Sequence, residues 1–377
     1  MMLWWQQNLW DGSPGDPWML DAWTVLLAAC VVAAGIIVAF IRSRRNYLLL
    51  PELPRGDFKE PPQDVIVIVP ARNEEANIAR VVSSFPAGWV LVVDDDSTDG
   101  TAMIAKQNTA EVIFAPRLQK GLVGKPNACA AGAKATVSDW ILFVDADTWY
   151  APEFLCSLLD YAEREQADLV SVFPHQVTRS FWEKVLMPYA FALLFCGING
   201  KSMNDPQSSD AMANGQCMLF RRKFYDFIGG HGSVASSVIE DAEIAYRAKR
   251  HHGQVRVLRA EKMAFVRMYA GFGEIWNGFS KNSFRFMQND RKMGIQVFIS
   301  SMFILSWLPL MVLLAQTEQW VPLGILGILP TLLLTPWYGG LASLFAPLAI
   351  YVFQLIALNG MVTALFGVKV KWKGRPV

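Results

Sequence analysis

Two long stretches of the chain are almost free of charged residues. Residues 22–41 carry no charge, and residues 295–368 carry a single one, Glu318. A helix of about 20 apolar residues is long enough to cross the roughly 30 Å hydrocarbon core of a bilayer. The first stretch therefore predicts one transmembrane anchor, and the second predicts a transmembrane region of two or three spans.

The charges that flank the first stretch predict its orientation. Acidic residues precede it, whereas Arg42, Arg44 and Arg45 follow it. A cleaved signal peptide would carry its basic residues in front of the apolar run, so we interpret the segment as a retained anchor. Because basic residues remain on the cytoplasmic side, we expect residues 1–21 outside the cell and residues 42–294 in the cytoplasm. The protein is then a multi-pass protein of the inner (plasma) membrane.

The number of C-terminal spans stays open at this point. The middle part of the region contains Pro322 and Pro330, and it can form a separate span, a re-entrant piece or part of a neighbouring span. Three spans would place the basic tail, residues 369–377, outside, against the positive-inside rule. Two spans would place it inside, so we favour a tail in the cytoplasm and leave the count at two or three spans.

A third apolar segment, residues 181–199, has an uncharged core that is too short to cross a bilayer, and it contains Pro188. The pattern predicts a buried core helix. The alternative is a helix that lies in the membrane interface beside the active site.

Between the long apolar stretches, short apolar runs alternate with helical patterns. Residues 64–69, 89–93 and 140–144 are each typical of a buried strand, and helices are predicted at residues 76–85 and 101–108. Strands that alternate with helices indicate an α/β domain with a mostly parallel, Rossmann-like sheet. In such sheets, ligands bind at the carboxyl ends of the strands.

The amino-acid composition supports this division into membrane segments and a soluble domain. The whole chain is 53% hydrophobic and 18% charged, but residues 42–294 hold 59 charged residues in 253, as a soluble domain does. The chain has 34 basic and 33 acidic residues, so it lacks the basic excess of a nucleic-acid-binding protein. Its five cysteines form no CxxC pair, which argues against a disulfide framework or a zinc site.

Acidic residues follow the predicted strands. Asp94, Asp95 and Asp96 come after residues 89–93, and Asp145 and Asp147 come after residues 140–144. Residues i and i+2 of an extended chain face the same side, so Asp145 and Asp147 repel each other unless a cation lies between them. Carboxylate oxygens suit Mg²⁺ or Mn²⁺, which are often shared with phosphate oxygens. The pattern predicts a divalent metal site, against the alternative of a solvated acidic turn.

Two further segments carry candidate chemistry. Residues 121–127 contain two glycines and Lys125, which could meet a phosphate, although an ordinary surface turn is the better interpretation of this segment alone. Glu240 and Asp241 begin a predicted helix at residues 241–250, where carboxylates stabilise the helix N-terminus. The functional alternative is a general base, which accepts a proton from a hydroxyl group.

In their order along the chain, these segments resemble family 2 glycosyltransferases. The matching motifs, within roughly residues 64–285, are VIVPARNE at 67–74, VVDDDSTDGT at 92–101, GKPNA at 124–128, VDAD at 144–147 and ED at 240–241. Within the family, the sequence is most similar to membrane-bound enzymes that glycosylate hydroxylated carotenoids and to the hopene-associated enzymes. The motifs that carry this second similarity are NGQ at 214–216, RMY at 267–269, GFSKN at 278–282 and WKGR at 372–375.

The resemblance implies a glycosyltransferase-A fold and an inverting transfer from a nucleotide sugar, usually a UDP-sugar such as UDP-glucose. It assigns Asp241 as the catalytic base and makes Asp145 and Asp147 the DxD motif, with Asp147 as the more direct metal ligand. Asp95 would accept a hydrogen bond from the uracil edge. The residues assigned to the nucleotide-sugar site are Pro70, Arg72, Glu74, Asp94, Asp95, Lys125, Asp145 and Glu240.

Two departures from the family pattern narrow the expected function. Asp96 stands where the commoner motif Asp-Asp-Gly-Ser has glycine, and its role is open. The Gln-x-x-Arg-Trp motif of processive polysaccharide synthases is missing, which argues for the transfer of a single sugar. Lys281 could supply the positive charge that this motif would otherwise provide.

The membrane segments predict the acceptor. A cytoplasmic domain held against the bilayer can receive a membrane lipid, so we expect the hydroxyl group of a carotenoid or another terpenoid to be glycosylated. The alternatives are a polyprenyl-phosphate acceptor, a processive synthase, a nucleotide sensor or scaffold with a degenerate fold, and a transporter. The acidic clusters argue against the sensor, and the near absence of intramembrane charge argues against the transporter.

Overall fold

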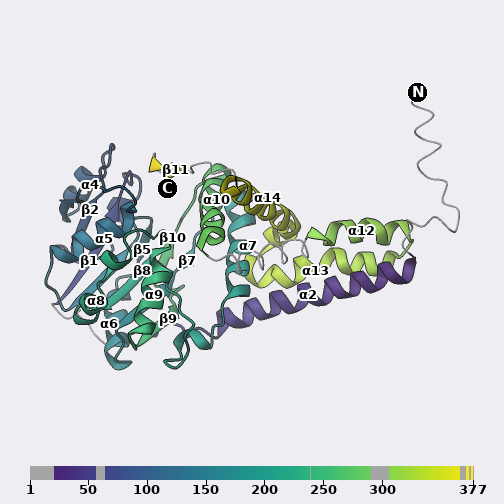
Figure 1. The fold of residues 1–377 in the computed structure, drawn as a ribbon, viewed down its shortest axis with the longest axis horizontal. Helices are drawn as coiled ribbons and strands as arrows, with labels where there is room; N and C mark the ends of the chain where they lie inside the picture. The colour runs from purple at the N-terminus through teal and green to yellow at the C-terminus, as the bar shows by residue number, and fades with distance from the viewer. Residues whose placement is uncertain are drawn as a thin grey trace.

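The computed structural model describes residues 21–56, 64–237, 239–289, 305–365, 371–372 and 375–376. Figure 1 shows an α/β domain at one end of the molecule and a group of long helices that extends away from it. The N-terminal end of the first helix, α2 (Ala22–Leu48), lies farthest from the sheets.

The α/β domain is built on a seven-stranded sheet with the order β3-β2-β1-β4-β8-β6-β9. Every neighbouring pair is parallel except those of β8, which runs antiparallel to both β4 and β6. The mostly parallel α/β sheet predicted from the sequence is therefore confirmed. Its strands are β1 (Val65–Ala71), β2 (Val90–Asp94), β3 (Glu111–Phe114), β4 (Trp140–Val144), β6 (Leu169–Phe173), β8 (Cys217–Arg221) and β9 (Val255–Arg259).

The central strands are almost entirely apolar because both faces of the sheet are covered. Every residue of β2, β4 and β6 is buried. Side chains of one face, such as Leu142, pack in one core with helices α3 (Ile78–Val82), α4 (Thr101–Gln107) and α6 (Phe154–Arg164). Those of the other face, such as Phe143, pack in a second core with α5 (Gly124–Lys134), α8 (Arg222–Phe227) and α9 (Glu240–Arg250).

A second, three-stranded sheet follows directly after β4. Its order is β5-β10-β7, formed by Thr148–Tyr150, Ala264–Val266 and His175–Gln176. The backbone N–H of Arg267 donates to the carbonyl oxygen of Asp147, at 3.3 Å. This sheet, which the sequence pattern does not predict, brings the segment after β10 beside the predicted DxD motif.

Helix α2 contains the predicted anchor at residues 22–41 and continues to Leu48. Its last turns are fastened to α7 (Phe181–Gly197), where the Ser43 hydroxyl donates to the carbonyl of Ala192 at 2.6 Å. Figure 1 shows α7 at the junction of the two parts, crossing α2 steeply. Eight of the 17 residues of α7 are buried and three are exposed, so residues 181–199 contain the buried core helix that the sequence predicts.

The described C-terminal helices are α10 (Phe272–Asn289), α12 (Trp307–Gln316), α13 (Trp320–Tyr338) and α14 (Ala346–Leu365), with the short helix η3 (Leu341–Phe345) between α13 and α14. Within the described residues, three helical segments are long and apolar enough to cross a membrane: α2, α13 and Leu341–Gly360.

The proline-containing middle piece forms a helix of its own, α13, instead of merging with a neighbour. Gln319, in the turn before it, donates to the carbonyl of Ala22 at 2.7 Å, so this turn lies at the far end of α2. Residues 1–20, 290–304 and most of the tail at 369–377 lie outside the described residues. The predicted number of spans and the side of the tail stay predictions.

Candidate active site

The carboxyl ends of β1 and β2 are tied to each other by hydrogen bonds. The N–H of Asp95 donates to the carbonyl of Ala71 at 2.8 Å, and the Arg72 guanidinium donates to the carbonyl of Asp95. The N–H of Glu74 donates to the hydroxyl of Thr101, also at 2.8 Å. The structure therefore brings together five predicted nucleotide-sugar residues, which are Pro70, Arg72, Glu74, Asp94 and Asp95.

The three consecutive aspartates after β2 have different surroundings. Asp94 is buried, and its carboxylate accepts hydrogen bonds from the N–H and the hydroxyl of Ser97, so it shapes the turn. Asp96 has a positive φ of 62°, which favours glycine, although aspartate tolerates it better than most residues do. The backbone at Asp96 thus explains why the commoner motif has glycine there. Its exposed carboxylate lies 3.5 Å from the Arg72 guanidinium.

Lys125 is the centre of the candidate site. It lies in the first turn of α5, and its Nζ is 2.6 Å from Asp145 Oδ1 and 3.2 Å from Glu240 Oε1. The same ammonium group donates to the carbonyl of Gly215 at 3.2 Å. The interpretation of this segment as an ordinary surface turn is wrong, because a helix begins at Gly124 and directs Lys125 toward the ends of β4 and α9.

Burial and charge act together on this cluster. Burial alone would lower the pKa of Lys125, but the charges of Asp145 and Glu240 offset it and hold that pKa well above its usual value. The pKa of Glu240 is raised, first by burial and then by the neighbouring Asp241 and Asp145, although Lys125 acts in the opposite direction. One ammonium group therefore neutralises two carboxylates, of which Glu240 is buried while Asp145 and Lys125 itself are partly exposed.

Asp241, the predicted base, lies in the first turn of α9. Its Oδ2 accepts from the N–H of Gly215 at 2.9 Å, and its Oδ1 accepts from the N–H of Ala242 at 2.8 Å. A Cβ atom at Gly215 would lie 3.0 Å from Asp241 Oδ2 and 3.1 Å from Lys125 Nζ. Glycine is thus required for the close approach of these two side chains. Sequence reasoning gave no role to Gly215, and its only signal was the Asn-Gly-Gln motif.

The DxD motif lies at the carboxyl end of β4, as predicted. The N–H of Asp145 donates to the carbonyl of Gln216 at 3.2 Å, and the hydroxyl of Thr148 donates to the carbonyl of Asp145 at 2.6 Å. Within the described part of the chain, no group of three or more His, Cys, Asp or Glu side chains could hold a metal ion. Two carboxylates with phosphate oxygens as further ligands are a common arrangement for Mg²⁺. The donor set fits an ion that binds together with a nucleotide diphosphate.

Arginines surround the other side of the DxD motif. Arg267 forms an ion pair of 2.7 Å with Glu183, a fully buried residue in the first turn of α7. Arg80 lies 3.6 Å from the centre of the Trp149 ring. Its pKa is lowered, first by burial and then by the charge of Arg179, whereas Asp147 raises it. The Arg179 and Arg267 guanidinium groups therefore lie near that of Arg80, an arrangement that sequence reasoning missed because the three residues lie far apart in the chain.

Aromatic side chains continue from this point into the helices. The ring of Trp182, next to Glu183, lies 4.7 Å from that of Phe272, which lies 5.8 Å from that of Trp276. Phe181 contacts Phe345, and both are about half exposed, at 47% and 45%. We call these five residues the aromatic cluster. It joins the first turns of α7 and α10 to η3 and gives the polar site an apolar neighbour.

His231 lies fully buried behind the site. Its Nδ1 is 3.0 Å from the hydroxyl of Tyr225, and its ring packs against Phe143 of β4. Burial, with a contribution from the charge of Lys125, lowers the pKa of His231 to about 3. The ring is therefore neutral at physiological pH. The side chain of Lys281, in α10, lies outside the described side chains.

The fold and the site define a membrane-associated enzyme with a glycosyltransferase-A-like α/β domain. The chain belongs to glycosyl transferase family 2. The model of that family matches residues 66–229. The predicted family, enzyme class and similarity to its carotenoid branch are confirmed.

Two relatives support this assignment, and one solved structure has a similar fold. The chain is 30% identical over 259 residues to a 4,4'-diaponeurosporenoate glycosyltransferase of Staphylococcus haemolyticus, with 66% of this chain and 68% of the relative covered. It is 30% identical over 278 residues to the enzyme of that name from Staphylococcus aureus, with 70% of each chain covered. Its fold is similar to that of a mannosyltransferase from Pyrobaculum calidifontis in complex with GDP-Man and Mn²⁺. That match has a TM-score of 0.52 and 17% identity, and it covers 92% of this chain and all of the other.

Proposed function

We propose that this protein transfers one sugar from a nucleotide sugar, UDP-glucose or a similar donor, to the hydroxyl group of a membrane lipid of the carotenoid or terpenoid class. The observation that carries the proposal is the position of the site. Lys125, Asp145 and Asp241 converge at the strand ends, and the aromatic cluster leads from the same place into the apolar helices.

The donor half of the site is formed by the loops after β1, β2 and β4. Pro70, Arg72, Glu74 and Asp95 would lie beside the nucleotide, and the positive charge of Lys125 would face the diphosphate. Asp145 and Asp147 would hold a divalent cation, Mg²⁺ or Mn²⁺, which neutralises negative charge on the departing diphosphate when it is bound. Because Lys125 contacts Asp145 at 2.6 Å, donor binding would redistribute the contacts of that carboxylate.

In the transfer step, the acceptor oxygen forms a bond to the anomeric carbon while the bond from that carbon to the diphosphate breaks. Asp241 takes the proton of the acceptor hydroxyl, and the nucleoside diphosphate leaves. The attack comes from the face opposite the leaving group, so the anomeric configuration inverts. Two backbone N–H groups hold the Asp241 carboxylate in one orientation, which favours proton transfer to a fixed position.

The acceptor would arrive from the bilayer. We propose that α2 and the C-terminal helices cross the inner (plasma) membrane and that the α/β domain lies in the cytoplasm, since Arg42, Arg44 and Arg45 are at the domain end of α2. The aromatic cluster would then contact the lipid near the membrane surface, where aromatic side chains are favoured.

A second candidate function is transfer to a lipid carboxylate, which would produce a glycosyl ester. The relatives are named for a carboxylate, diaponeurosporenoate, and the arginines near Asp147 could bind an anionic group. An acceptor that is already ionised needs no general base. A polyprenyl phosphate would use the same arginines.

Mass spectrometry of lipids from cells with and without the protein tests these proposals together. A new hexosylated lipid that withstands both mild alkali and mild acid supports the hydroxyl acceptor. Cleavage by mild alkali indicates an ester, and cleavage by mild acid indicates a phosphodiester. If no lipid gains a sugar while purified protein glycosylates a water-soluble acceptor at full rate in lipid-free detergent, the lipid acceptor is wrong.

A further inference from the structure

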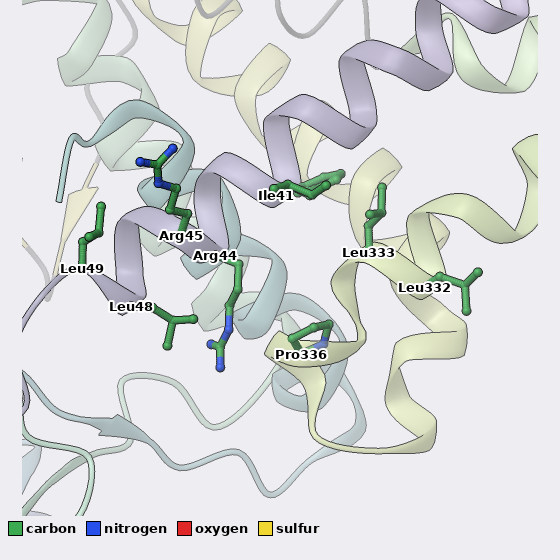
Figure 2. A pocket seen from close by; sticks show the side chains of 9 residues that line it. Ile41, Arg44, Arg45, Leu48, Leu49, Leu332, Leu333 and Pro336 are labelled. Carbon is green, nitrogen blue, oxygen red and sulfur yellow. The ribbon is translucent and has the colours of Figure 1, made fainter. Parts of the chain in front are cut away.

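A groove of about 470 Å³ lies between the last turns of α2 and the second half of α13. Its walls are mainly apolar and include Ile41, Leu48, Leu332 and Pro336 (Figure 2). None of the residues that line it belongs to the candidate active site. Its volume is within the usual range for sites that bind small molecules, about 300–1,000 Å³.

Two arginines give this apolar groove a polar end. Figure 2 shows Arg44 extending between Leu48 and Pro336, while Arg45 extends from another side of the same helix. The Arg44 guanidinium lies 5.3 Å from the centre of the Trp337 ring and 5.4 Å from that of Tyr47. Among the described residues, neither Arg44 nor Arg45 forms an ion pair with a carboxylate. The groove therefore combines apolar walls with the positive charge of Arg44, which forms no ion pair among the described residues, while Arg45 adds a second positive charge on another side of the same helix.

We propose that this groove binds an anionic membrane phospholipid, with one acyl chain along the apolar wall and the phosphate at Arg44. Charge complementarity identifies the ligand, because basic pockets between membrane helices bind anionic headgroups. A guanidinium also presents a planar set of donors that matches a phosphate. Two aromatic rings restrict Arg44 beforehand, so little side-chain freedom remains to be lost on binding. Arg45 adds to the attraction without a fixed contact.

The position of Arg44 gives the bound lipid a structural effect. The Tyr47 ring also lies 5.1 Å from the Arg259 guanidinium, and its hydroxyl donates to Glu261. Arg259 belongs to β9, and its Nε donates to the carbonyl of Leu50 at 2.9 Å. The Tyr47 ring is thus a neighbour of both Arg44 and Arg259, and Arg259 joins the residues after α2 to the sheet. A phosphate at Arg44 would stabilise this contact and raise the thermal stability of the whole chain.

The test uses the full chain in neutral detergent, titrated with phosphatidylglycerol or with phosphatidylcholine of the same acyl chains and followed by native mass spectrometry. We expect one phosphatidylglycerol per chain, bound more tightly than phosphatidylcholine, together with a higher Tm. The R44Q variant should weaken phosphatidylglycerol binding about fivefold, as expected for about 1 kcal/mol per basic residue. R42Q is the matched control, because Arg42 is an exposed arginine on the same helix outside the groove, and it should change binding less than twofold.

A further variant tests the apolar wall. Leu332 is 59% exposed, so the larger side chain of L332W would fill part of the groove with little disturbance of the core, and it should weaken binding of both phospholipids. The proposal is overturned if R42Q and R44Q weaken binding equally, if phosphatidylcholine binds as tightly as phosphatidylglycerol, or if L332W has no effect. Displacement of phosphatidylglycerol by a lower concentration of a polyprenyl phosphate would assign the groove to a different lipid. Unfolding curves without lipid verify that each variant folds, and R44K replaces R44Q if it does not.

Discussion

The α/β domain and the helical region use apolar residues in opposite ways. In the sheet, Val67 and Val92 are fully buried, and charged side chains collect at the strand ends. In α2, Leu27 is 68% exposed and Val31 is 56% exposed, although both belong to an uncharged helix. Exposed apolar surface on this scale is stable only when lipid or another protein covers it. The first region buries its apolar residues within its own fold. The second exposes apolar residues that lipid or another protein must cover.

The difference assigns separate tasks to the two regions. The clustered charges at Lys125, Glu240 and Asp241, of which Glu240 is buried, suit the chemistry of the donor sugar, whereas the exposed helices suit contact with a lipid. Substitutions in one region should therefore leave the task of the other intact. The following variants test that separation, in order of decreasing expected effect.

The largest effect is expected from Asp241→Asn. An amide cannot accept the proton of the acceptor hydroxyl, so transfer should fall by a factor of about 10²–10⁴ while nucleotide-sugar binding survives. Steady-state kinetics and calorimetric titration with the donor measure the two quantities. Glu243→Gln is the control, because Glu243 is exposed in the same first turn of α9. Near-normal turnover of Asp241→Asn would show that Asp241 is not the base, and it would favour an acceptor that is already ionised.

Gly215→Ala should reduce turnover by less than the roughly 100-fold that a misplacement of about 1 Å costs, because its neighbours need to move by only a few tenths of an ångström. The added Cβ would lie only 3.0 Å from Asp241 Oδ2 and 3.1 Å from Lys125 Nζ, so one of these groups must move. Gly232→Ala is a suitable control, because a Cβ there meets no atom within 4 Å. Equal turnover of the two variants would contradict a positioning role for Gly215.

The buried His231 makes the α/β domain sensitive to acid. In the folded protein the pKa of His231 is about 3, so the ring stays neutral as the pH falls from 6.5 toward 3. In the unfolded chain the same ring has its ordinary pKa of about 6.5 and binds a proton over this range. Stability should therefore fall by about 1.4 kcal/mol per pH unit below pH 6.5, a tenfold change in the unfolding equilibrium.

His231→Asn should remove this slope, which is measured by chemical unfolding of the full chain between pH 5 and pH 7.5. The exposed His175 provides the control variant, His175→Asn, whose slope should match that of the wild type. An unchanged slope in His231→Asn would mean that another group causes the acid sensitivity.

The smallest effect is expected in the aromatic cluster. Trp182→Ala should raise the KM for the lipid acceptor about fivefold, because a lost aromatic contact costs about 1 kcal/mol. The KM for the nucleotide sugar should not change. Trp320→Ala, at the far end of α13, removes a 64% exposed tryptophan and is the control. A rise in both KM values would mean that the cluster supports the site as a whole.

The sequence was most informative where one local rule determined the structure. Continuous apolar runs predicted β1, β2 and β4, and Asp94 and Asp145 do stand at the carboxyl ends of β2 and β4. The antiparallel strand β8 and the small sheet could not be predicted, because their pairing depends on contacts between distant segments. For the same reason the sequence did not reveal the pair of Glu183 and Arg267, which are 84 residues apart.

Lys125 shows a second limit of local reasoning. Seen alone, its segment is a polar turn with two glycines, and only the folded chain reveals the two carboxylates that surround its ammonium group. Gly215 is similar, because the need for glycine comes from side chains on α5 and α9. The position of Asp96, where the commoner motif has glycine, could be explained only from its positive backbone angle φ.

The continuity of α2 has a consequence for which lipids the enzyme can use. The helix is 27 residues long, about 40 Å, and its last turns are bonded to α7 through Ser43 and Asn46. If α2 crosses the membrane as proposed, these bonds to α7 would hold the active site at one height over the bilayer. We expect acceptors to be selected by how far their polar end projects from the membrane. A lipid of the right chemistry but the wrong length would then escape glycosylation.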